Sequence, residues 1–386
     1  MTIRLCSDII DKQDIDNLIS WLETLPKLTK GQKTVEFEEM FSSYLGCDYS
    51  VFCNSGSSAN LLITSALIQS GMLRNKKIVV PQVSWSTTVF PAMQLGLQPI
   101  MCDCNLSNLG IDIDHFSRII KDYKPSALIL VHVLGLDSNI EKILEICEEN
   151  GVFLIEDTCE SLGSCVSGTK LGNFGLASSF SFYFGHHIST IEGGMVCTND
   201  KEFADIVKMI RSHGWDRDLD EETKLKYKKQ YNVKEFDALY KFYYQGFNLR
   251  STDLQAVIGL NQIPKMENIS QTRQRNYQHY LNSIKDELWK PRSQQDTVSN
   301  MGYPLIVGNR EELSKALVDN NVECRPLVSG SMGAQPAWKN KYGECTMKNA
   351  SVVNDNGMYV PNHQDLTLED IDKVCKIINN VGRSHV

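Results

Sequence analysis

Short apolar runs alternate with stretches of helical periodicity along the first half of the chain. The helical stretches are Asn60–Gln69, Asp114–Asp122 and Asn139–Asn150, where apolar residues recur every three or four positions. The runs that predict strands are Ile78–Val80, Pro99–Cys102, Ala127–Leu134, Val152–Ile155, Ser179–Tyr183 and Gly194–Cys197. This alternation predicts an α/β fold with a mostly parallel central sheet flanked by helices.

The pattern changes near Asp253, where a long helical stretch begins that Pro264 interrupts. A strand at Tyr303–Val307 and a helix at Glu311–Asp319 are predicted after it. We therefore expect a large domain over residues 1–258 and a smaller C-terminal α+β domain over residues 259–386.

Two further segments have distinctive patterns. Thr367 and Asp370 form a variant of the capping box, which predicts the start of a final helix with one apolar face. The segment Asp216–Phe247 is rich in lysine and tyrosine, and we interpret it as an insertion or an excursion that contacts a partner.

Composition narrows the class of protein. With 386 residues, 42% hydrophobic and 22% charged, the chain is typical of a soluble globular protein with a large core. Its net charge of −8 disfavours nucleic acid or an anionic membrane as a partner. Met1–Lys12 has no signal-peptide pattern and no apolar run is long enough to span a membrane, so a cytoplasmic protein is expected.

The 12 cysteines are scattered and are expected to be buried free thiols. Cys102 and Cys104 form an isolated C-x-C pair without a second pair or a histidine cluster. We therefore expect no metal site.

Two segments carry groups suited to an anionic or aromatic ligand. The turn Asn54–Asn60 consists of small residues, so its backbone could approach a phosphate at the start of a helix. The competing interpretation is that the turn only caps the helix. Asp157 and Glu160 follow an apolar strand, where α/β folds place ligands. A carboxylate there could pair with a protonated pyridine nitrogen, or it could be a solvated strand end.

Four other side chains are candidates. Ser181 ends a predicted strand and offers a hydroxyl for phosphate, and Trp85 could stack on a flat ring or simply pack in the core. His186 and His187 lie outside any apolar periodicity, and a positioned imidazole suits acid–base catalysis near neutral pH. Taken alone, the histidine pair is equally compatible with a structural role.

The chain order of these features resembles one family. A Gly-Ser turn, an aromatic residue, a strand-end aspartate, a serine and the His186 region follow one another as in the DegT/DnrJ/EryC1/StrS sugar aminotransferases. Gly246–Ala256 resembles that family's G-[YF]-N-x-R-x-[TS]-[DE]-x-Q-A segment, and Arg325–Leu327 resembles a later substrate-side loop. The resemblance implies an aspartate-aminotransferase-like fold type I enzyme that uses pyridoxal 5′-phosphate.

The resemblance also implies individual roles. Gly56, Ser57 and Ser181 would bind the cofactor phosphate, Asp157 would pair with the pyridine nitrogen, and Trp85 would stack on the ring. Asn248 would reach the phosphate from a neighbouring subunit of a homodimer, and Glu160 stands where many relatives carry glutamine or histidine. The residues expected on the substrate side are His213, Arg217, Arg250 and Arg325. Arg211 could also bind a diphosphate, although any one arginine is more often an ion-pairing residue.

One position departs from the family. His186 stands five residues after Ser181, where the aminotransferases carry the lysine that holds the cofactor covalently. Within the family this exchange resembles 3-dehydratases, in which pyridoxamine phosphate formed with glutamate serves to remove the C3 oxygen of a nucleotide-linked 4-keto-6-deoxy sugar. His186 would be the base, the sugar GDP-linked, and the pathway a colitose-type dideoxysugar synthesis for O-antigen.

Three alternatives remain at this point. A 3-dehydratase that uses an iron–sulfur cluster is disfavoured because Cys324, Cys345 and Cys375 are too few for its ligands. An ordinary sugar aminotransferase is disfavoured by the missing lysine. A CDP-, dTDP- or UDP-linked substrate, or a non-catalytic relative that binds the cofactor, stays open.

Overall fold

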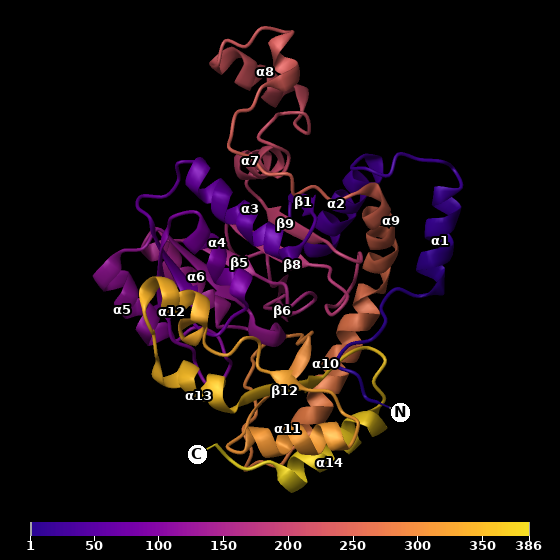
Figure 1. Ribbon diagram of the computed structural model, residues 1–386, viewed down its shortest axis with the longest axis vertical. Helices are drawn as coiled ribbons and strands as arrows, with labels where there is room; N and C mark the ends of the chain where they lie inside the picture. The colour runs from indigo at the N-terminus through magenta and orange to yellow at the C-terminus, as the bar shows by residue number, and fades with distance from the viewer. Residues whose placement is uncertain (1, 386) are drawn as a thin grey trace.

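The computed structural model describes residues 2–385, and its centre is a seven-stranded sheet (Figure 1). The strand order is β1 (Tyr49–Cys53), β9 (Gly194–Thr198), β8 (Ala177–Ser181), β5 (Phe153–Asp157), β4 (Ala127–Val131), β2 (Lys77–Pro81) and β3 (Gln98–Cys102). Strand β9 pairs antiparallel with both of its neighbours, whereas the other four pairings are parallel. The prediction of a mostly parallel α/β sheet is confirmed.

Helices cover both faces of this sheet. On one face lie α3 (Gly56–Gln69), α4 (Ser86–Gln94) and α7 (Lys201–Arg211), which share an apolar cluster with strand residues such as Val80 and Ile155. On the other face lie α5 (Ile113–Tyr123) and α6 (Ile140–Glu149), packed against Leu128 and Leu154. Because neighbouring strand residues point to opposite faces, both faces are apolar and both are buried.

An aromatic cluster attaches the first helices to the sheet. Helices α1 (Lys12–Leu22) and α2 (Gln32–Leu45) precede β1, and both pack against α9 (Asp253–Gln262). Phe37 of α2 meets Phe52 of β1 edge to face, with ring centroids 4.8 Å apart. The packing of Phe37 also requires Gly259, because a Cβ at Gly259 would lie 2.5 Å from the Phe37 ring.

The C-terminal part has its own three-stranded sheet, in the order β10 (Gly302–Ile306), β12 (Gly357–Pro361) and β11 (Arg325–Pro326). The helices around it are α10 (Met266–Ser283), α11 (Arg310–Asp319), α12 (Pro336–Tyr342), α13 (Lys348–Asn356) and α14 (Leu368–Val381). Helix α14 starts with the predicted capping box of Thr367 and Asp370.

Pro264 lies in the one-turn helix η3 (Ile263–Lys265) between α9 and α10, so the predicted interruption is confirmed. The division at residues 258 and 259 stays a prediction, and that point lies inside α9.

Three predicted strands had wrong limits, and one of them, Val152–Ile155, extends to Asp157 in β5. The run Ala127–Leu134 leaves the sheet at Val131, and the short helix η1 (Val133–Gly135) follows, within which Leu134 has a left-handed backbone with φ of 51°. The run Ser179–Tyr183 is displaced, since β8 begins at Ala177 and ends at Ser181. Beyond Ser181 the backbone turns away as a loop that carries His186.

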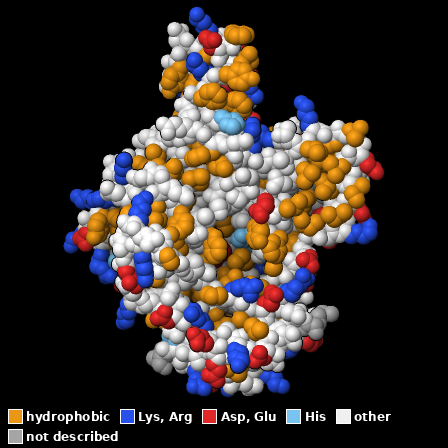
Figure 2. Space-filling model, in the orientation of Figure 1, with side chains coloured by type: hydrophobic (Ala, Val, Ile, Leu, Met, Phe, Trp, Pro, Cys, Tyr) orange, Lys and Arg blue, Asp and Glu red, His pale blue; other side chains and the backbone are white. Residues whose placement is uncertain are grey.

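The segment predicted as an excursion projects from the body at the top of Figure 1. It contains α8 (Glu221–Gln230), none of whose residues is buried, and the short helix η2 (Asp237–Tyr240). Large apolar side chains are exposed on it, with Phe236 84% accessible (Figure 2). Within residues 2–385, no helix combines the length and apolarity needed to cross a membrane.

Candidate active site

A cavity of about 800 Å³ opens at the carboxyl ends of β4, β5 and β8. Its floor comes from Asp157 and Ser181 at the ends of β5 and β8, and one side comes from the starts of α3 and α4. The other side comes from the N-terminal segment and the C-terminal sheet. Figure 2 shows a hollow near the centre of the face, apolar inside and charged along its rim. Ligands of open α/β sheets bind at this edge.

The start of α3 forms an anion-binding corner of the cavity. Ser55 is the N-cap, and its hydroxyl accepts from the Ser58 N–H at 3.0 Å, as the capping interpretation requires. The next N–H groups of Gly56 and Ser57 have no acceptor inside the helix, as in every first helical turn. The Ser181 side chain lies against Gly56, and the Ser57 hydroxyl donates to Thr87 at 3.2 Å. Backbone N–H groups and hydroxyls gathered at a helix start suit a phosphate.

Gly56 is required by the closeness of this packing. A Cβ there would lie 2.6 Å from the Ser181 Cβ, so Gly56→Ala must displace Ser181 or the start of α3. We expect phosphate affinity to fall about tenfold, measured by titrating the protein with pyridoxal phosphate, because overpacking of this kind costs about 1–3 kcal/mol. Gly185→Ala is the matched control, since nothing lies nearer than 3.9 Å to its added Cβ. Equal affinity of both variants would contradict the prediction.

Asp157 is a buried carboxylate whose two oxygens have different surroundings. Its Oδ2 accepts from Asn60 Nδ2 and from Thr88 Oγ1, each at 2.8 Å. Its Oδ1 has only long contacts, from the Cys159 N–H at 3.3 Å and the Ser179 hydroxyl at 3.4 Å. One oxygen is therefore fixed, whereas the other keeps accepting capacity toward a cationic donor in the cavity.

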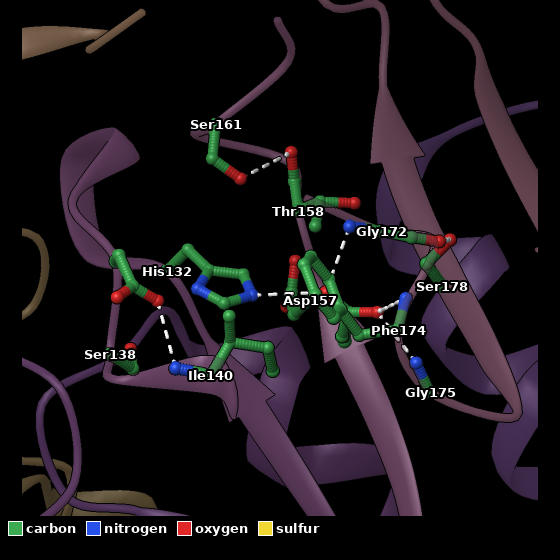
Figure 3. A network of polar contacts seen from close by, with 12 residues as sticks. His132, Ser138, Ile140, Asp157, Thr158, Ser161, Gly172, Phe174, Gly175 and Ser178 are labelled. Atoms are coloured by element: carbon green, nitrogen blue, oxygen red, sulfur yellow. Dashed lines mark hydrogen bonds and ion pairs between the residues drawn. The ribbon is translucent and has the colours of Figure 1, made fainter. Parts of the chain in front are cut away.

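The neighbouring carboxylate, Glu156, secures the strand that carries Asp157. Glu156 accepts from the N–H groups of Gly172, Phe174 and Gly175 at 2.8–2.9 Å, and His132 Nε2 lies 3.2 Å away (Figure 3). All of these groups are on the side of β5 that turns away from Asp157, as alternation along a strand demands. The end of β5 is therefore held on both sides.

Trp85 is the N-cap residue of α4 and lines the cavity with 54% of its surface accessible. The alternative of a tryptophan packed in the core is therefore wrong. A half-exposed indole on a cavity wall offers an apolar face to a flat ring.

His186 lines the cavity, and its buried Nδ1 has no hydrogen-bond partner. Its loop is closed by the Phe182 N–H on the Gly193 carbonyl and by the Thr190 N–H on the Phe182 carbonyl, both at 2.9 Å. Burial lowers the pKa of His186 to about 4, against a smaller opposing influence of Asp157. The imidazole is therefore neutral at physiological pH and able to accept a proton.

His187 is buried in another environment. Its Nε2 donates to the Ser299 carbonyl at 2.8 Å, and burial lowers its pKa well below the ordinary value. It does not line the cavity, so of the two adjacent histidines His186 is the one placed for chemistry.

Glu160 also lines the cavity, where its carboxylate accepts from the Leu134 N–H at 2.7 Å. Burial raises its pKa to about 7, with Asp157 adding to the rise and the Leu134 hydrogen bond opposing it. Glu160 can therefore act as donor or acceptor near neutral pH.

A second group of predicted residues lies outside this cavity in the single chain. Exposed Asn248 forms an isolated bridge with Ser212, and its Oδ1 accepts from Arg250 Nε at 3.2 Å. His213 and Arg217 both contact Trp215, with the Arg217 guanidinium 3.8 Å from the ring centroid. These residues surround the base of the projecting segment.

The remaining two arginines differ. Arg325 lines the cavity, as expected for a substrate-side residue. Arg211 is buried, and its guanidinium donates to Glu38 at 2.6 Å and to Asp218 at 2.9 Å. The alternative of an ion-pairing residue therefore describes Arg211, and a diphosphate-binding role for it is wrong.

Several cavity residues gave no recognisable signal in the sequence. Thr88 orients Asp157, yet it is an ordinary helical threonine three positions after Trp85. Arg4, Cys6 and Asp8 belong to the cavity only because the N-terminal segment folds back onto the C-terminal part. Within residues 2–385, no three histidine, cysteine, aspartate or glutamate side chains are arranged so that they could hold a metal ion.

The cavity and fold agree with a match to known proteins. Residues 8–379 match the model of the DegT/DnrJ/EryC1/StrS aminotransferase family. The chain belongs to this family. A curated member, GDP-4-keto-6-deoxy-D-mannose 3-dehydratase of Yersinia pseudotuberculosis, is 33% identical, and the alignment covers 97% of each chain.

Solved structures of family members have the same fold as this chain. A GDP-4-keto-6-deoxymannose-3-dehydratase with a trapped PLP–glutamate geminal diamine has a TM-score of 0.90 at 30% identity, covering 97% of this chain and 99% of that one. A mutant of such an enzyme with bound GDP-perosamine has a TM-score of 0.89 at 30% identity, covering 97% of this chain and all of the other. The fold is thus that of the family's aminotransferase-like enzymes.

Proposed function

We propose that this chain removes the C3 oxygen from a nucleotide-linked 4-keto-6-deoxy sugar, with GDP-4-keto-6-deoxy-D-mannose as substrate and glutamate as amino donor. The observation that carries the proposal concerns the residues of the cavity wall. His186 lines the cavity, and no lysine among residues 2–385 does so. A family cavity without lysine holds its cofactor non-covalently. The similar enzymes, which act on this GDP-linked sugar, support the choice of nucleotide.

The cavity residues fit pyridoxal or pyridoxamine phosphate. The start of α3, with Gly56, Ser57 and Ser181, would hold the phosphate. Asp157 would accept from the pyridine nitrogen through Oδ1, and Trp85 would lie on the ring face. Glu160, with a pKa raised to about 7, would contact a polar ring substituent.

His186 has the central role in the proposed reaction. When bound, the cofactor supplies an amine for the C4 ketone and a ring that accepts electrons from its C4′ carbon. Neutral His186 would accept a proton at C4′ and would donate it to the hydroxyl that leaves C3. Asp157 would stabilise positive charge on the ring nitrogen. Residue 186 cannot trap the cofactor aldehyde as a lysine would.

The balance of the reaction follows from these roles. Glutamate gives up its amino group and two electrons and becomes 2-oxoglutarate. The sugar loses the C3 oxygen, and the nitrogen leaves as ammonia when water restores the C4 ketone. The product is a 4-keto-3,6-dideoxy sugar, which suits a cytoplasmic route to a colitose-type O-antigen sugar.

We also propose a homodimer with shared sites. Asn248 and Arg250 are near each other at the base of the projecting segment but outside their own chain's cavity. The exposed Phe236 and Tyr240 on the same segment would be covered in a dimer. His213 and Arg217 would then approach the partner's substrate. Sedimentation analysis should give twice the chain mass, and a monomer active at nanomolar concentration would contradict this arrangement.

The direct test is to incubate the purified protein with GDP-4-keto-6-deoxymannose, glutamate and pyridoxal phosphate. The expected result is a product lighter by one oxygen, with one 2-oxoglutarate and one ammonia formed per sugar. A product that keeps nitrogen would identify an aminotransferase, and an unchanged sugar with no 2-oxoglutarate would identify a non-catalytic relative. Parallel CDP-, dTDP- and UDP-linked sugars test the nucleotide.

The pH dependence of kcat/KM for the nucleotide sugar should reflect the buried imidazole of His186. Because burial lowers the pKa of His186, its neutral form persists below the ordinary value of 6.5 and is lost as the pH falls through about 4. The acid limb should therefore lie nearer pH 4 than pH 6.5, as measured on initial rates of 2-oxoglutarate release. An acid limb at pH 6.5 that disappears in His186→Asn would contradict this assignment.

A further inference from the structure

The N-terminal segment, residues 3–8, forms one wall of the cavity because it is bound to the C-terminal part of the chain. The Ile3 N–H donates to the Asn321 carbonyl at 2.9 Å, and the Glu323 N–H donates to the Ile3 carbonyl at 3.0 Å. The Leu5 N–H donates to the Glu323 carboxylate at 2.8 Å. Ile3 itself is buried in the C-terminal apolar core. The backbone is therefore fixed on both sides of Arg4.

A second set of contacts fixes the same segment from another side. His363 Nε2 donates to the Arg4 carbonyl at 3.1 Å, and Gln364 Nε2 donates to the Ser7 hydroxyl at 2.7 Å. Between these points Arg4, Cys6 and Asp8 line the cavity. Arg4 thus has a backbone held by hydrogen bonds and a side chain that lines the cavity.

Arg4 and Arg325 are the only lysine or arginine side chains among the described residues that line the cavity. The Arg4 guanidinium pairs with Asp8 at 2.8 Å, and their side chains are 55% and 78% exposed. Such a surface pair contributes little and opens easily. Arg325 Nη1 donates to the Cys324 carbonyl at 2.8 Å, and no carboxylate of residues 2–385 lies within ion-pair distance of it.

The two arginines come from adjoining parts of the fold. Glu323, which fixes the N-terminal segment, is two residues before Arg325, and Arg325 pairs with Tyr359 across β11 and β12. Tyr359 and Glu323 also line the cavity. Both guanidinium groups thus belong to the wall opposite the start of α3, where the proposed phosphate donors of the cofactor lie.

We propose that Arg4 acts with Arg325 as an anion-binding pair for the reactants, not for the cofactor. The ligand would be a pair of anionic oxygens, from either the diphosphate of the nucleotide sugar or a carboxylate of the amino donor. Arginine matches both groups because its planar fork donates two parallel hydrogen bonds. On binding, Arg4 exchanges Asp8 for the ligand. The identity of these reactants rests on the proposed function.

The test measures binding without turnover, by calorimetric titration of the cofactor-loaded protein with GDP and, separately, with glutarate. Arg4→Ala should weaken one of these probes about tenfold, as loss of a charge-assisted hydrogen bond does. Arg4→Lys should lose less affinity for that probe, because lysine keeps the positive charge although it lacks the planar guanidinium that donates two parallel hydrogen bonds. Arg383→Ala is the matched control, since Arg383 is an exposed arginine paired with Glu312 and does not line the cavity.

The probe that weakens identifies the source of the anion. Asp8→Asn frees Arg4, so its affinity for that probe should equal or exceed that of the unaltered protein. The proposal is overturned if Arg4→Ala binds both probes normally, or if Asp8→Asn weakens binding as much as Arg4→Ala does, which would show that the ion pair is only structural. A protein that binds a probe through Arg4 yet leaves the C3 oxygen in place would refute the proposed function alone.

Discussion

Replacing His186 with asparagine should lower kcat for loss of the C3 oxygen by about 10²–10⁴-fold, the usual contribution of a positioned acid–base group. Asparagine fills similar space in the cavity wall but cannot accept the proton. Cofactor affinity should change little, because the proposed cofactor contacts come from α3, Trp85 and Asp157. The measurement is single-turnover formation of the dideoxy sugar together with cofactor titration.

Two comparisons make this result specific to His186. His186→Lys should create a covalent link to the cofactor, visible as an absorbance shift, and should also suppress dehydration. His187→Asn removes a buried hydrogen bond to Ser299 and should lower the melting temperature with a much smaller effect on kcat. Unchanged dehydration in His186→Lys would exclude His186 as the base.

Replacing Asp157 with asparagine should cost about 10²–10³-fold in kcat, comparable to the loss of one preorganised electrostatic contact in other enzymes. The hydrogen bonds determine the orientation of the new amide. Asn60 and Thr88 both donate to Oδ2, so the amide oxygen must occupy that position and the NH₂ group must face the cavity. It would then oppose a protonated ring nitrogen instead of accepting from it. Rates of both half-reactions with saturating cofactor test this prediction.

The control for Asp157 is Thr88→Val, which removes one of the two donors to Oδ2 but keeps the carboxylate. Thr88→Val should lower kcat about tenfold, because one hydrogen bond to a charged group is lost. If Thr88→Val and Asp157→Asn lowered kcat equally, the charge of Asp157 would have no special part in the reaction.

The sheet was predictable where strands are buried on both faces. β2, β4 and β5 are continuous apolar runs between helical stretches, and the structure confirms them. β1 is as long as β2, β4 and β5 but was missed because Ser50 interrupts the apolar run of Tyr49–Cys53. The limits of β4 and β8 were wrong because the backbone leaves the sheet while the sequence is still apolar or aromatic: η1 follows β4, and the His186 loop follows β8.

The residues of the candidate site also fall into those that the sequence could predict and those that it could not. Gly56, Asp157 and Ser181 could be found because each ends a strand or begins a helix, and His186 because it stands five residues after Ser181. The structure brings all four into one cavity. The wall formed by Arg4 and Glu323 could not be found, since it depends on contacts between residues more than 300 positions apart. In the proposed homodimer the place of Asn248 would depend on a second chain, which no pattern within one chain describes.

A cavity without lysine also has a thermodynamic consequence. A ligand held only by hydrogen bonds, stacking and charge leaves at a rate set by its affinity, so the occupied fraction of the protein follows the free concentration of that ligand. Each occupied molecule is also harder to unfold, by an amount that grows with the logarithm of that concentration. The free concentration of the cofactor would thereby set both the occupied fraction of this protein and its stability against unfolding.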